Sequence, residues 1–335
     1  MKKLIYISLA LSFFMISCEE QLFEAEPENN PVGIFEELWS TFDEEYGVFE
    51  ERGVDWDEQY TIYKPMVTLN TTDDELFDII KLMLNKLDDG HVQMTVPNKQ
   101  FYFANNFYRN KIDDDLFNLD LIENSYFTSE TKKLAEDHMT LGWIGDVGYV
   151  HARWIFTFEY TNDFLDYFAD AKGLIIDLRH DGGGDFTWVY SQFGRLTQEE
   201  RYVCRSKTKN GPGKDDYTEW YDWYLEPKGE FFDKPIVCLT DPYTISAAER
   251  MAYIFKALPN AIQMGDATNG SIGTKIGREL ANGWKFTIVT QKIESFDGKF
   301  YEGVGIPPDV YIKNTMDEMN QGIDKTLETA IERLN

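Results

Sequence analysis

The sequence predicts an α/β protein in which a helical module precedes an α/β core. Hydrophobic residues recur at helical spacing in the first third of the chain, and from Gly142 onward short apolar runs alternate with amphipathic segments. Hydrophobic residues make up 43% of the 335 residues and aromatic residues 15%, which is enough for a packed core. We therefore expect a helical bundle module over residues 32–96, a mixed connecting segment over 97–141 and an α/β core over 142–335.

The first 31 residues have the pattern of an export leader followed by a tether. Two lysines precede a 14-residue apolar run, Leu4 to Ser17, which is too short for a bilayer that needs about 20 residues. The run ends in Met-Ile-Ser-Cys18, which is similar to a bacterial lipobox; an ordinary signal peptide with a chance cysteine is the alternative. We expect a signal peptide over 1–17, lipidation of Cys18 and an acidic, unstructured tether over 18–31. These features predict a lipid anchor in a membrane of the bacterial cell envelope, on the periplasmic side or at the cell surface.

Composition limits what the rest of the chain can bind. A formal net charge of −27, with no basic patch, argues against a nucleic-acid partner. Four scattered histidines and three cysteines lack the close spacing of a metal site, so we expect no metal and no cofactor. Export permits a disulfide between Cys204 and Cys238, but Cys238 is also typical of a buried small hydrophobe in an apolar run.

Three helices are expected in the module. The first carries hydrophobic residues at helical spacing from Phe35 to Tyr46, and the second follows Asp55 as its N-cap. The third opens with the capping box Thr72-x-x-Glu75 and leads into Leu-Asp-Asp-Gly-His91.

In the core, strands and helices are expected to alternate. The candidate strands are 148–156, 173–178, 236–239, 261–264 and 285–290. The candidate helices are 162–171, 186–196, 246–257 and 324–334. Residues 205–233 are polar and aromatic with Gly and Pro, which indicates an excursion over the surface.

Two turns in the core have the local pattern of a catalytic site. Ser246 follows a strand and a sharp turn and begins a helix, which exposes a nucleophile and leaves the Ala247 N–H free to hold an oxyanion. The alternative is that Ser246 only caps this helix, with Glu249 completing a capping box. Three glycines, Gly182 to Gly184, follow another strand and could turn their N–H groups toward an anion; a plain tight turn is the alternative.

Two further residues are candidates only in combination with these turns. His91 lies just past a helix end and could serve as a general base near neutral pH, although a lone histidine is more often a surface or core residue. Glu302 could orient the histidine as the third member of a triad, although alone it is an acidic turn residue.

Taken in order, five segments resemble the serine peptidase family of tricorn core peptidases, C-terminal-processing (tail-specific) proteases and interphotoreceptor retinoid-binding protein. The segments are Leu-x-Asp-x-His, Asp-Leu-Arg-x-x-Gly-Gly-Gly, Thr-x-Ser-Ala-Ala-Glu, Gly-Asp-x-Thr-x-Gly and Glu-Gly-Val-x-x-x-Pro-Asp. The resemblance covers roughly residues 32–334 and implies a crotonase-like (ββα) core behind the helical module. The connecting segment 97–141 is too short for the PDZ domain that many relatives insert.

The resemblance also distinguishes two branches of the family. In the C-terminal-processing branch the base is a lysine, but this chain has Ser271 at that place, with Lys275 four residues on. In the tricorn-like branch the base is a histidine at the end of the helical module and a glutamate completes the set, which matches His91 and Glu302. His180 and Asp181 stand where the family often has asparagines, so His180 is a rival base.

The tricorn-like branch implies a site between module and core. Its members would be the nucleophile Ser246, the base His91, the orienting acid Glu302 and the oxyanion-hole N–H groups of Ala247 and of Gly182 or Gly183. We expect an endopeptidase or carboxy-terminal-directed peptidase that acts on peptides or proteins, with an activating limb near pH 6–7, the range of an unperturbed imidazole. The alternatives are a non-catalytic hydrophobic-ligand binder of the same fold, an esterase or thioesterase, and a crotonase-like acyl-CoA enzyme.

Overall fold

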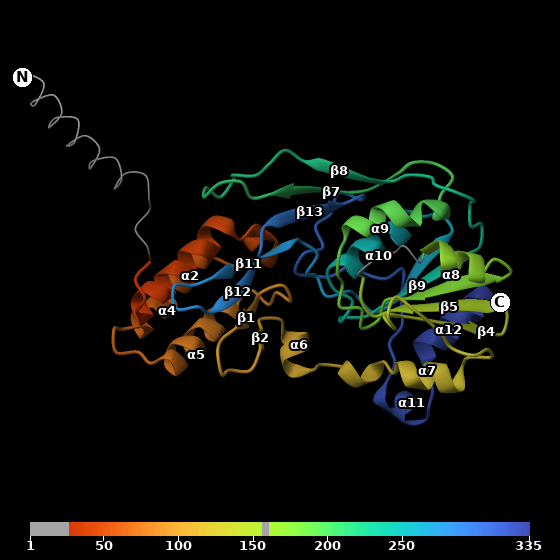
Figure 1. The fold of residues 1–335 in the computed structure, drawn as a ribbon, viewed down its shortest axis with the longest axis horizontal. Helices are drawn as coiled ribbons and strands as arrows, with labels where there is room; N and C mark the ends of the chain where they lie inside the picture. Colours follow the sequence, from red (N-terminus) through yellow and green to blue (C-terminus); the bar gives the residue numbers. More distant parts are fainter. Residues whose placement is uncertain (1–26, 156–160) are drawn as a thin grey trace, which may run out of the picture.

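The computed structural model describes residues 27–155 and 161–335, which form two bodies side by side (Figure 1). The leader, Cys18 and most of the tether lie outside the described residues. None of the helices in the described ranges combines the length and the hydropathy needed to cross a membrane.

The first body is the helical module, and its helices follow the predicted patterns. They are α2 (Pro31–Glu45), α3 (Phe49–Arg52), α4 (Trp56–Tyr63), the 3-10 turn η1 (Lys64–Met66) and α5 (Asp73–Leu84). The predicted capping box is present, because the Glu75 N–H donates to Thr72 Oγ1 at 3.3 Å and the Thr72 N–H donates to Glu75 Oε2 at 2.9 Å. The buried faces of α2 and α5 form one hydrophobic cluster with the strands beneath them.

A four-stranded sheet completes this first body. Its order is β11 (Lys275–Glu279), β12 (Lys285–Val289), β1 (Gln93–Thr95) and β2 (Tyr102–Phe103). The sequence placed residues 275–289 in the C-terminal core, but β12 pairs antiparallel with β1, so this late hairpin packs under the helical module. The hairpin therefore joins the two halves of the chain next to His91.

The second body is the α/β core. Its seven-stranded sheet has the order β14 (Val310–Tyr311), β10 (Ala261–Gly265), β9 (Ile236–Thr240), β6 (Gly173–Asp177), β5 (Val147–Ala152), β4 (Met139–Ile144) and β3 (Lys132–Leu134). Neighbouring strands from β14 to β5 are parallel. β4 pairs antiparallel with β5, and β3 pairs antiparallel with β4.

Side chains of these strands alternate between two hydrophobic clusters, one on each face of the sheet. Leu174 and Ile176 pack in the cluster with α8 (Thr161–Tyr167), α9 (Thr187–Gln192), η3 (Phe193–Leu196) and α10 (Ala247–Ala257). Ile175 packs on the other face with α7 (Leu119–Ser125) and α12 (Lys325–Leu334). The predicted α/β class with an N-terminal helical module is confirmed.

The remaining elements connect or cover these two bodies. The connecting segment contributes α6 (Asn106–Asn110) and η2 (Asp114–Leu116), and α11 (Met316–Asn320) precedes α12. The predicted excursion is a β arm, in which β7 (Arg201–Thr208) and β8 (Tyr221–Leu225) pair with β13 (Gln291–Ser295) across the top of both bodies in Figure 1. Tyr217 ties the arm to the module, because its hydroxyl donates to the Gly47 carbonyl at 2.7 Å. Cys204 and Cys238 are both buried and free, so no disulfide joins them.

Candidate active site

The turn before α10 presents Ser246 in a strained backbone conformation. Ser246 has φ 66° and ψ −122°, a region that non-glycine residues seldom adopt and that costs on the order of 1–3 kcal/mol. Its backbone N–H is fixed by the Ser271 carbonyl at 3.1 Å and by Glu249 Oε2 at 3.0 Å. Glu249 thus fills its part of the predicted capping box, whereas its own N–H donates to the Ser246 carbonyl at 3.0 Å and not to the hydroxyl. The hydroxyl is therefore available for chemistry.

Glu249 is the buried anchor of this turn. Besides the Ser246 N–H, its carboxylate accepts hydrogen bonds from Thr268 Oγ1 at 2.6 Å, the Gly270 N–H at 2.7 Å and the Ser271 N–H at 3.0 Å. Burial raises the pKa of Glu249 to about 7, and these donors oppose the rise. Glu249 therefore holds the loop 268–271 against the nucleophile.

A second turn, at the end of the helical module, brings His91 to the same place. The Gly90 N–H donates to Ser271 Oγ at 2.9 Å, and the Ser271 carbonyl in turn accepts the Ser246 N–H. A Cβ on Gly90 would lie 2.5 Å from the Ile245 side chain and 2.9 Å from Asn269 Oδ1, so a larger residue here would require these side chains to shift. Ser246 and His91 both line one cavity of about 700 Å³.

The His91 imidazole is buried and forms no hydrogen bond with the described residues. His91 is only 2% exposed, and its Nδ1 and Nε2 both lack a partner within the described ranges. Burial lowers the pKa of His91 to about 3, and the nearby Asp89 carboxylate opposes this shift. The ring is therefore a neutral proton acceptor at pH 7, and the activity limb expected near pH 6–7 moves to lower pH because an imidazole in this site is not an unperturbed one.

A cluster of buried charges lies behind His91. Asp89 Oδ1 accepts the His91 backbone N–H at 2.8 Å, and Asp89 Oδ2 accepts the Tyr46 hydroxyl at 2.7 Å. Arg52 pairs with Asp89 at 3.3 Å and with Glu302 at 2.6 Å, and all three charged side chains are at most 2% exposed. Against the effect of burial, Arg52 holds the pKa of Asp89 below its usual value.

Glu302 is joined to this cluster and not to the imidazole. Its Oε2 accepts the N–H groups of Ile272 and Gly273, each at 3.0 Å, and its Oε1 accepts from Arg52. The path from Glu302 to His91 therefore runs through Arg52 and Asp89. The predicted role of Glu302 as orienting acid stays a prediction.

The three predicted oxyanion-hole N–H groups differ in whether they already donate a hydrogen bond within the protein. Gly183 touches the nucleophile turn, because a Cβ on it would lie 2.6 Å from Ser246 Cβ and 3.0 Å from the Ala247 nitrogen. The Gly182 N–H, however, donates to the Arg153 carbonyl at 3.1 Å, and the Gly183 N–H donates to Asp181 Oδ1 at 2.8 Å. Ala247, at the first turn of α10, is the donor whose position fits the prediction directly.

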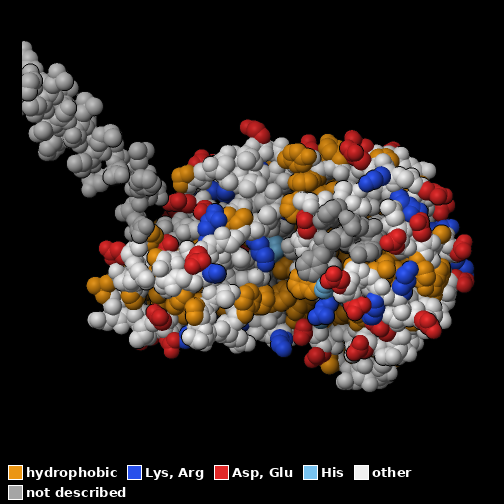
Figure 2. All heavy atoms as spheres, viewed as in Figure 1, with side chains coloured by type: hydrophobic (Ala, Val, Ile, Leu, Met, Phe, Trp, Pro, Cys, Tyr) orange, Lys and Arg blue, Asp and Glu red, His pale blue; other side chains and the backbone are white. Residues whose placement is uncertain are grey.

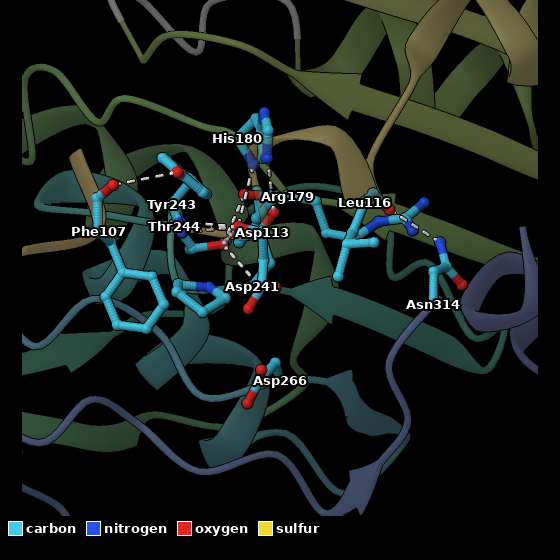
Figure 3. A network of polar contacts seen from close by, with 12 residues as sticks. Phe107, Asp113, Leu116, Arg179, His180, Asp241, Tyr243, Thr244, Asp266 and Asn314 are labelled. Carbon is cyan, nitrogen blue, oxygen red and sulfur yellow. Dashed lines mark hydrogen bonds and ion pairs between the residues drawn. The ribbon is translucent and has the colours of Figure 1, made fainter. Parts of the chain in front are cut away.

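The rival base His180 lies on the wall of the same cavity. Its Nε2 is 3.3 Å from Asp241 Oδ2, and its ring lies 4.5 Å from the Tyr243 ring. Figure 3 shows Asp241 between the two turns, where Oδ1 accepts the N–H groups of His180 and Thr244 at 3.1 and 3.0 Å. His180 thus lies beside a carboxylate, but its Nε2, like both ring nitrogens of His91, forms no hydrogen bond with the described residues.

Four side chains of this site were missed or left without a role by sequence reasoning. Arg52 ends a four-residue helix and gives no periodic signal, and Asp89 was visible only as part of the motif before His91. Glu249 was identified as a helix cap but not as the anchor of the loop 268–271. Lys275 lines the cavity with His91, whereas Ser271, at the place of the family's lysine, bonds to Gly90. In the described part of the chain, no group of His, Cys, Asp and Glu could hold a metal ion.

Comparison with known proteins gives matches over both bodies. The family model described as Peptidase family S41 matches residues 146–312, and that of the tricorn protease C1 domain matches residues 27–85. Tricorn protease from Thermoplasma volcanium is 29% identical over 196 residues, which are 56% of this chain and 17% of that protein. The carboxy-terminal processing protease CtpA from Bacillus subtilis is 27% identical over 140 residues, 42% of this chain and 28% of that protein. The chain therefore spans less than a third of each of these two relatives.

Solved structures match over a larger part of the chain. A candidate peptidase from Parabacteroides merdae superposes with a TM-score of 0.78 at 27% identity, and the match covers 92% of this chain and 97% of that one. Mature CPAF has a TM-score of 0.68 at 10% identity, with 91% and 96% covered, and shares the fold.

Proposed function

This chain belongs to peptidase family S41, and we propose that it cleaves peptide bonds through an acyl-enzyme on Ser246 with His91 as general base. One observation carries the proposal: Ser246 and His91 line one cavity, and both ring nitrogens of His91 are without a hydrogen-bond partner among the described residues. Family membership supports a serine-type peptidase, and the activity, residue roles, substrate and location below are part of the proposal.

The first half of the reaction forms the acyl-enzyme. Ser246 Oγ attacks the peptide carbonyl carbon while an imidazole nitrogen of His91 takes the hydroxyl proton. The carbonyl oxygen becomes an oxyanion that the Ala247 N–H stabilises, and one such donor is typically worth about 100- to 1,000-fold in turnover. The C–N bond then breaks, and His91 returns the proton to the leaving amine. Water repeats the sequence to release the acid and restore the Ser246 hydroxyl.

The charge cluster supplies the environment for the transient imidazolium. His91 gains a positive charge when it takes the proton, and the buried Asp89 carboxylate favours that charge. Arg52 and Glu302 keep Asp89 in place from the other side. The second oxyanion donor, Gly183, becomes free once its N–H leaves Asp181.

The test is covalent labelling. A fluorophosphonate probe should label the wild-type protein at a single serine and leave Ser246→Ala unlabelled, and the same substitution should abolish peptide cleavage. Parallel turnover of peptides and esters separates a peptidase from an esterase. Labelling that persists in Ser246→Ala, or tight binding of a hydrophobic ligand without any labelling, contradicts the proposal.

The sequence before residue 27 supports a further part of the proposal, namely that the peptidase is exported and lipid-anchored through Cys18. The full chain should partition with membranes and carry a lipid-sized mass increase at its new N-terminus. Cys18→Ser should remove both properties. A wild-type protein that remains in the aqueous fraction with its leader intact contradicts this part alone.

A further inference from the structure

The charge of the active-site cavity is opposite to the charge of the chain. The whole protein has 59 acidic against 32 basic residues, but the charged residues lining the cavity are Lys111, Arg153, Lys275 and the single acid Asp114. Figure 2 shows hydrophobic side chains gathered across the middle of the face in view, with Lys, Arg and His side chains and some Asp and Glu side chains beside them. A cleft that focuses positive charge attracts anions.

These three cations also have no carboxylate partner among the residues that the structure describes. Elsewhere on the surface lysines pair with acids, as Lys256 does with Asp309 at 2.6 Å. Within residues 27–155 and 161–335, by contrast, Lys111, Arg153 and Lys275 form no ion pair, and Lys275 Nζ donates a hydrogen bond to the neutral Gln93 Oε1 at 3.3 Å. A cation left unpaired in a partly apolar cavity is available to a charged ligand.

Arg153 and Lys275 come from different parts of the site. Arg153 belongs to the side of the glycine turn, since its carbonyl accepts the Gly182 N–H. Lys275 begins β11 on the side of His91, where its positive charge contributes to lowering the pKa of the imidazole. His91 must deliver its proton to the amine that leaves, so the leaving fragment of the peptide lies on the His91 side, next to Lys275.

We propose that Lys275 is a specificity residue that holds a carboxylate on the fragment released with the amine. The inference rests on the proposed function and names its substrate class. The carboxylate is either an Asp or Glu side chain just after the scissile bond or the free C-terminus of a peptide that ends there. The aromatic side chains of the cavity, among them Phe101 at 48% and Trp154 at 40% exposure, add an apolar surface for neighbouring residues.

Matched peptides test this inference. Cleavage sites are first mapped with a proteome-derived peptide mixture, and one good sequence is then made in four forms: acidic or amide side chain after the scissile bond, each with a free or amidated C-terminus. Wild type should prefer a carboxylate form by about 10-fold or more in kcat/KM, the scale of a charge-assisted hydrogen bond. The side-chain pair and the C-terminal pair show which carboxylate Lys275 takes.

Three variants separate Lys275 from its alternatives. Lys275→Gln should bring the carboxylate preference to within about 2-fold, and Lys275→Arg should keep it, because Arg still offers charged donors. Lys285→Gln removes an equally charged lysine from the next strand, outside the cavity and 3.6 Å from Glu279, and should behave as wild type. Equal rates on all four peptides with wild type, or an unchanged preference in Lys275→Gln, overturn the inference.

Two other results remain distinguishable. If Lys275→Arg is inactive on every peptide, Lys275 is the base and not the carboxylate holder, which overturns the inference but not the peptidase function. If neither labelling nor cleavage occurs, the proposed function fails, and binding of the four peptides to Ser246→Ala by fluorescence anisotropy decides the inference. Tighter binding of the carboxylate forms that Lys275→Gln removes supports the Lys275 site, and equal binding sinks it.

Discussion

Two buried arginines, Arg52 and Arg179, lie in clusters of nearly the same composition. Arg179 pairs with Asp177 at 2.6 Å and with Asp324 at 2.9 Å. Arg52 likewise pairs with Asp89 and Glu302. In each cluster a buried tyrosine hydroxyl donates to one carboxylate, at 2.8 Å from Tyr149 and 2.7 Å from Tyr46.

The clusters differ in what they join and in their histidine. The Arg179 cluster lies inside the core, where Asp324 also caps α12, and His151 Nε2 is bonded to the Arg179 carbonyl at 3.0 Å. The Arg52 cluster joins the module to the core, since Arg52 also donates to the Gly270 carbonyl at 2.6 Å, and its His91 ring has no partner in the described ranges. The same ion chemistry therefore fastens a helix in one place and leaves an imidazole free to react in the other.

Replacing the two histidines should give the largest contrast. His91→Ala removes the general base and should lower kcat by about 100- to 10,000-fold while the protein stays folded. His151→Ala leaves the Arg179 carbonyl without its partner and should cost about 1–3 kcal/mol of unfolding free energy, with kcat per folded molecule within a few fold of wild type. Active-site titration, steady-state kinetics and urea unfolding measure both quantities. Similar kcat losses in the two variants contradict the comparison.

Replacing either arginine should destabilise the protein, but only the replacement of Arg52 should change the pH profile of kcat/KM. Arg52→Met and Arg179→Met each leave buried carboxylates uncompensated and should cost about 3–5 kcal/mol of unfolding free energy. Arg52 also lowers the pKa of His91, so Arg52→Met should move the acid limb of kcat/KM to higher pH. Arg52→Lys, which keeps the charge, should show little shift. If the acid limb of kcat/KM lies at the same pH in wild type and in Arg52→Met, the role of Arg52 is purely structural.

The low pKa of His91 should appear as acid sensitivity of the fold. The imidazole has a pKa of about 6.5 when unfolded, whereas burial lowers the pKa of His91 to about 3 in the folded protein. Between these values the unfolded chain binds the extra proton, so stability falls as pH falls, by up to about 1.4 kcal/mol per pH unit. Between pH 6.5 and 5, the unfolding free energy measured with urea should therefore change less with pH in His91→Asn than in wild type, and the two slopes should differ by up to this amount. The same slope in both proteins argues against a buried neutral imidazole.

The tyrosines should give the smallest effects. Tyr46→Phe and Tyr149→Phe each remove one donor from a carboxylate that keeps its arginine, and each should cost about 1 kcal/mol of stability. Only Tyr46→Phe, whose partner Asp89 faces His91, should also lower kcat by a few fold. A kcat loss in Tyr149→Phe as large as that in Tyr46→Phe removes the distinction between the clusters.

The parts of the site that could be predicted were those with a local sequence signal. Ser246 follows a strand and begins a helix with Glu249 in its first turn, and His91 lies a few residues after a helix that opens with a capping box, so each gives a pattern within about 20 residues. Periodicity likewise predicted the strands that became β5, β6, β9 and β10 and the helices between them, but not β3, β4 or β14.

The parts that escaped prediction depend on contacts between distant segments. Arg52 donates to Glu302 across a separation of 250 residues in the sequence, and neither residue has a periodic signal. The pKa of His91 depends on burial between the two bodies, which a lone histidine in a sequence does not reveal. The bonds that occupy the Gly182 and Gly183 N–H groups depend on Arg153 and on the rotamer of Asp181.

The central claim is that His91 is the group that activates Ser246, and the rate of phosphonylation tests it most directly. Intact-protein mass spectrometry follows a fluorophosphonate reacting with wild type, His91→Ala and Lys275→Ala at pH 7, with circular dichroism to confirm that each variant is folded. We predict that His91→Ala reacts at least about 100-fold more slowly than wild type and that Lys275→Ala reacts at nearly the wild-type rate. Rapid labelling of His91→Ala together with loss of labelling in Lys275→Ala contradicts the account.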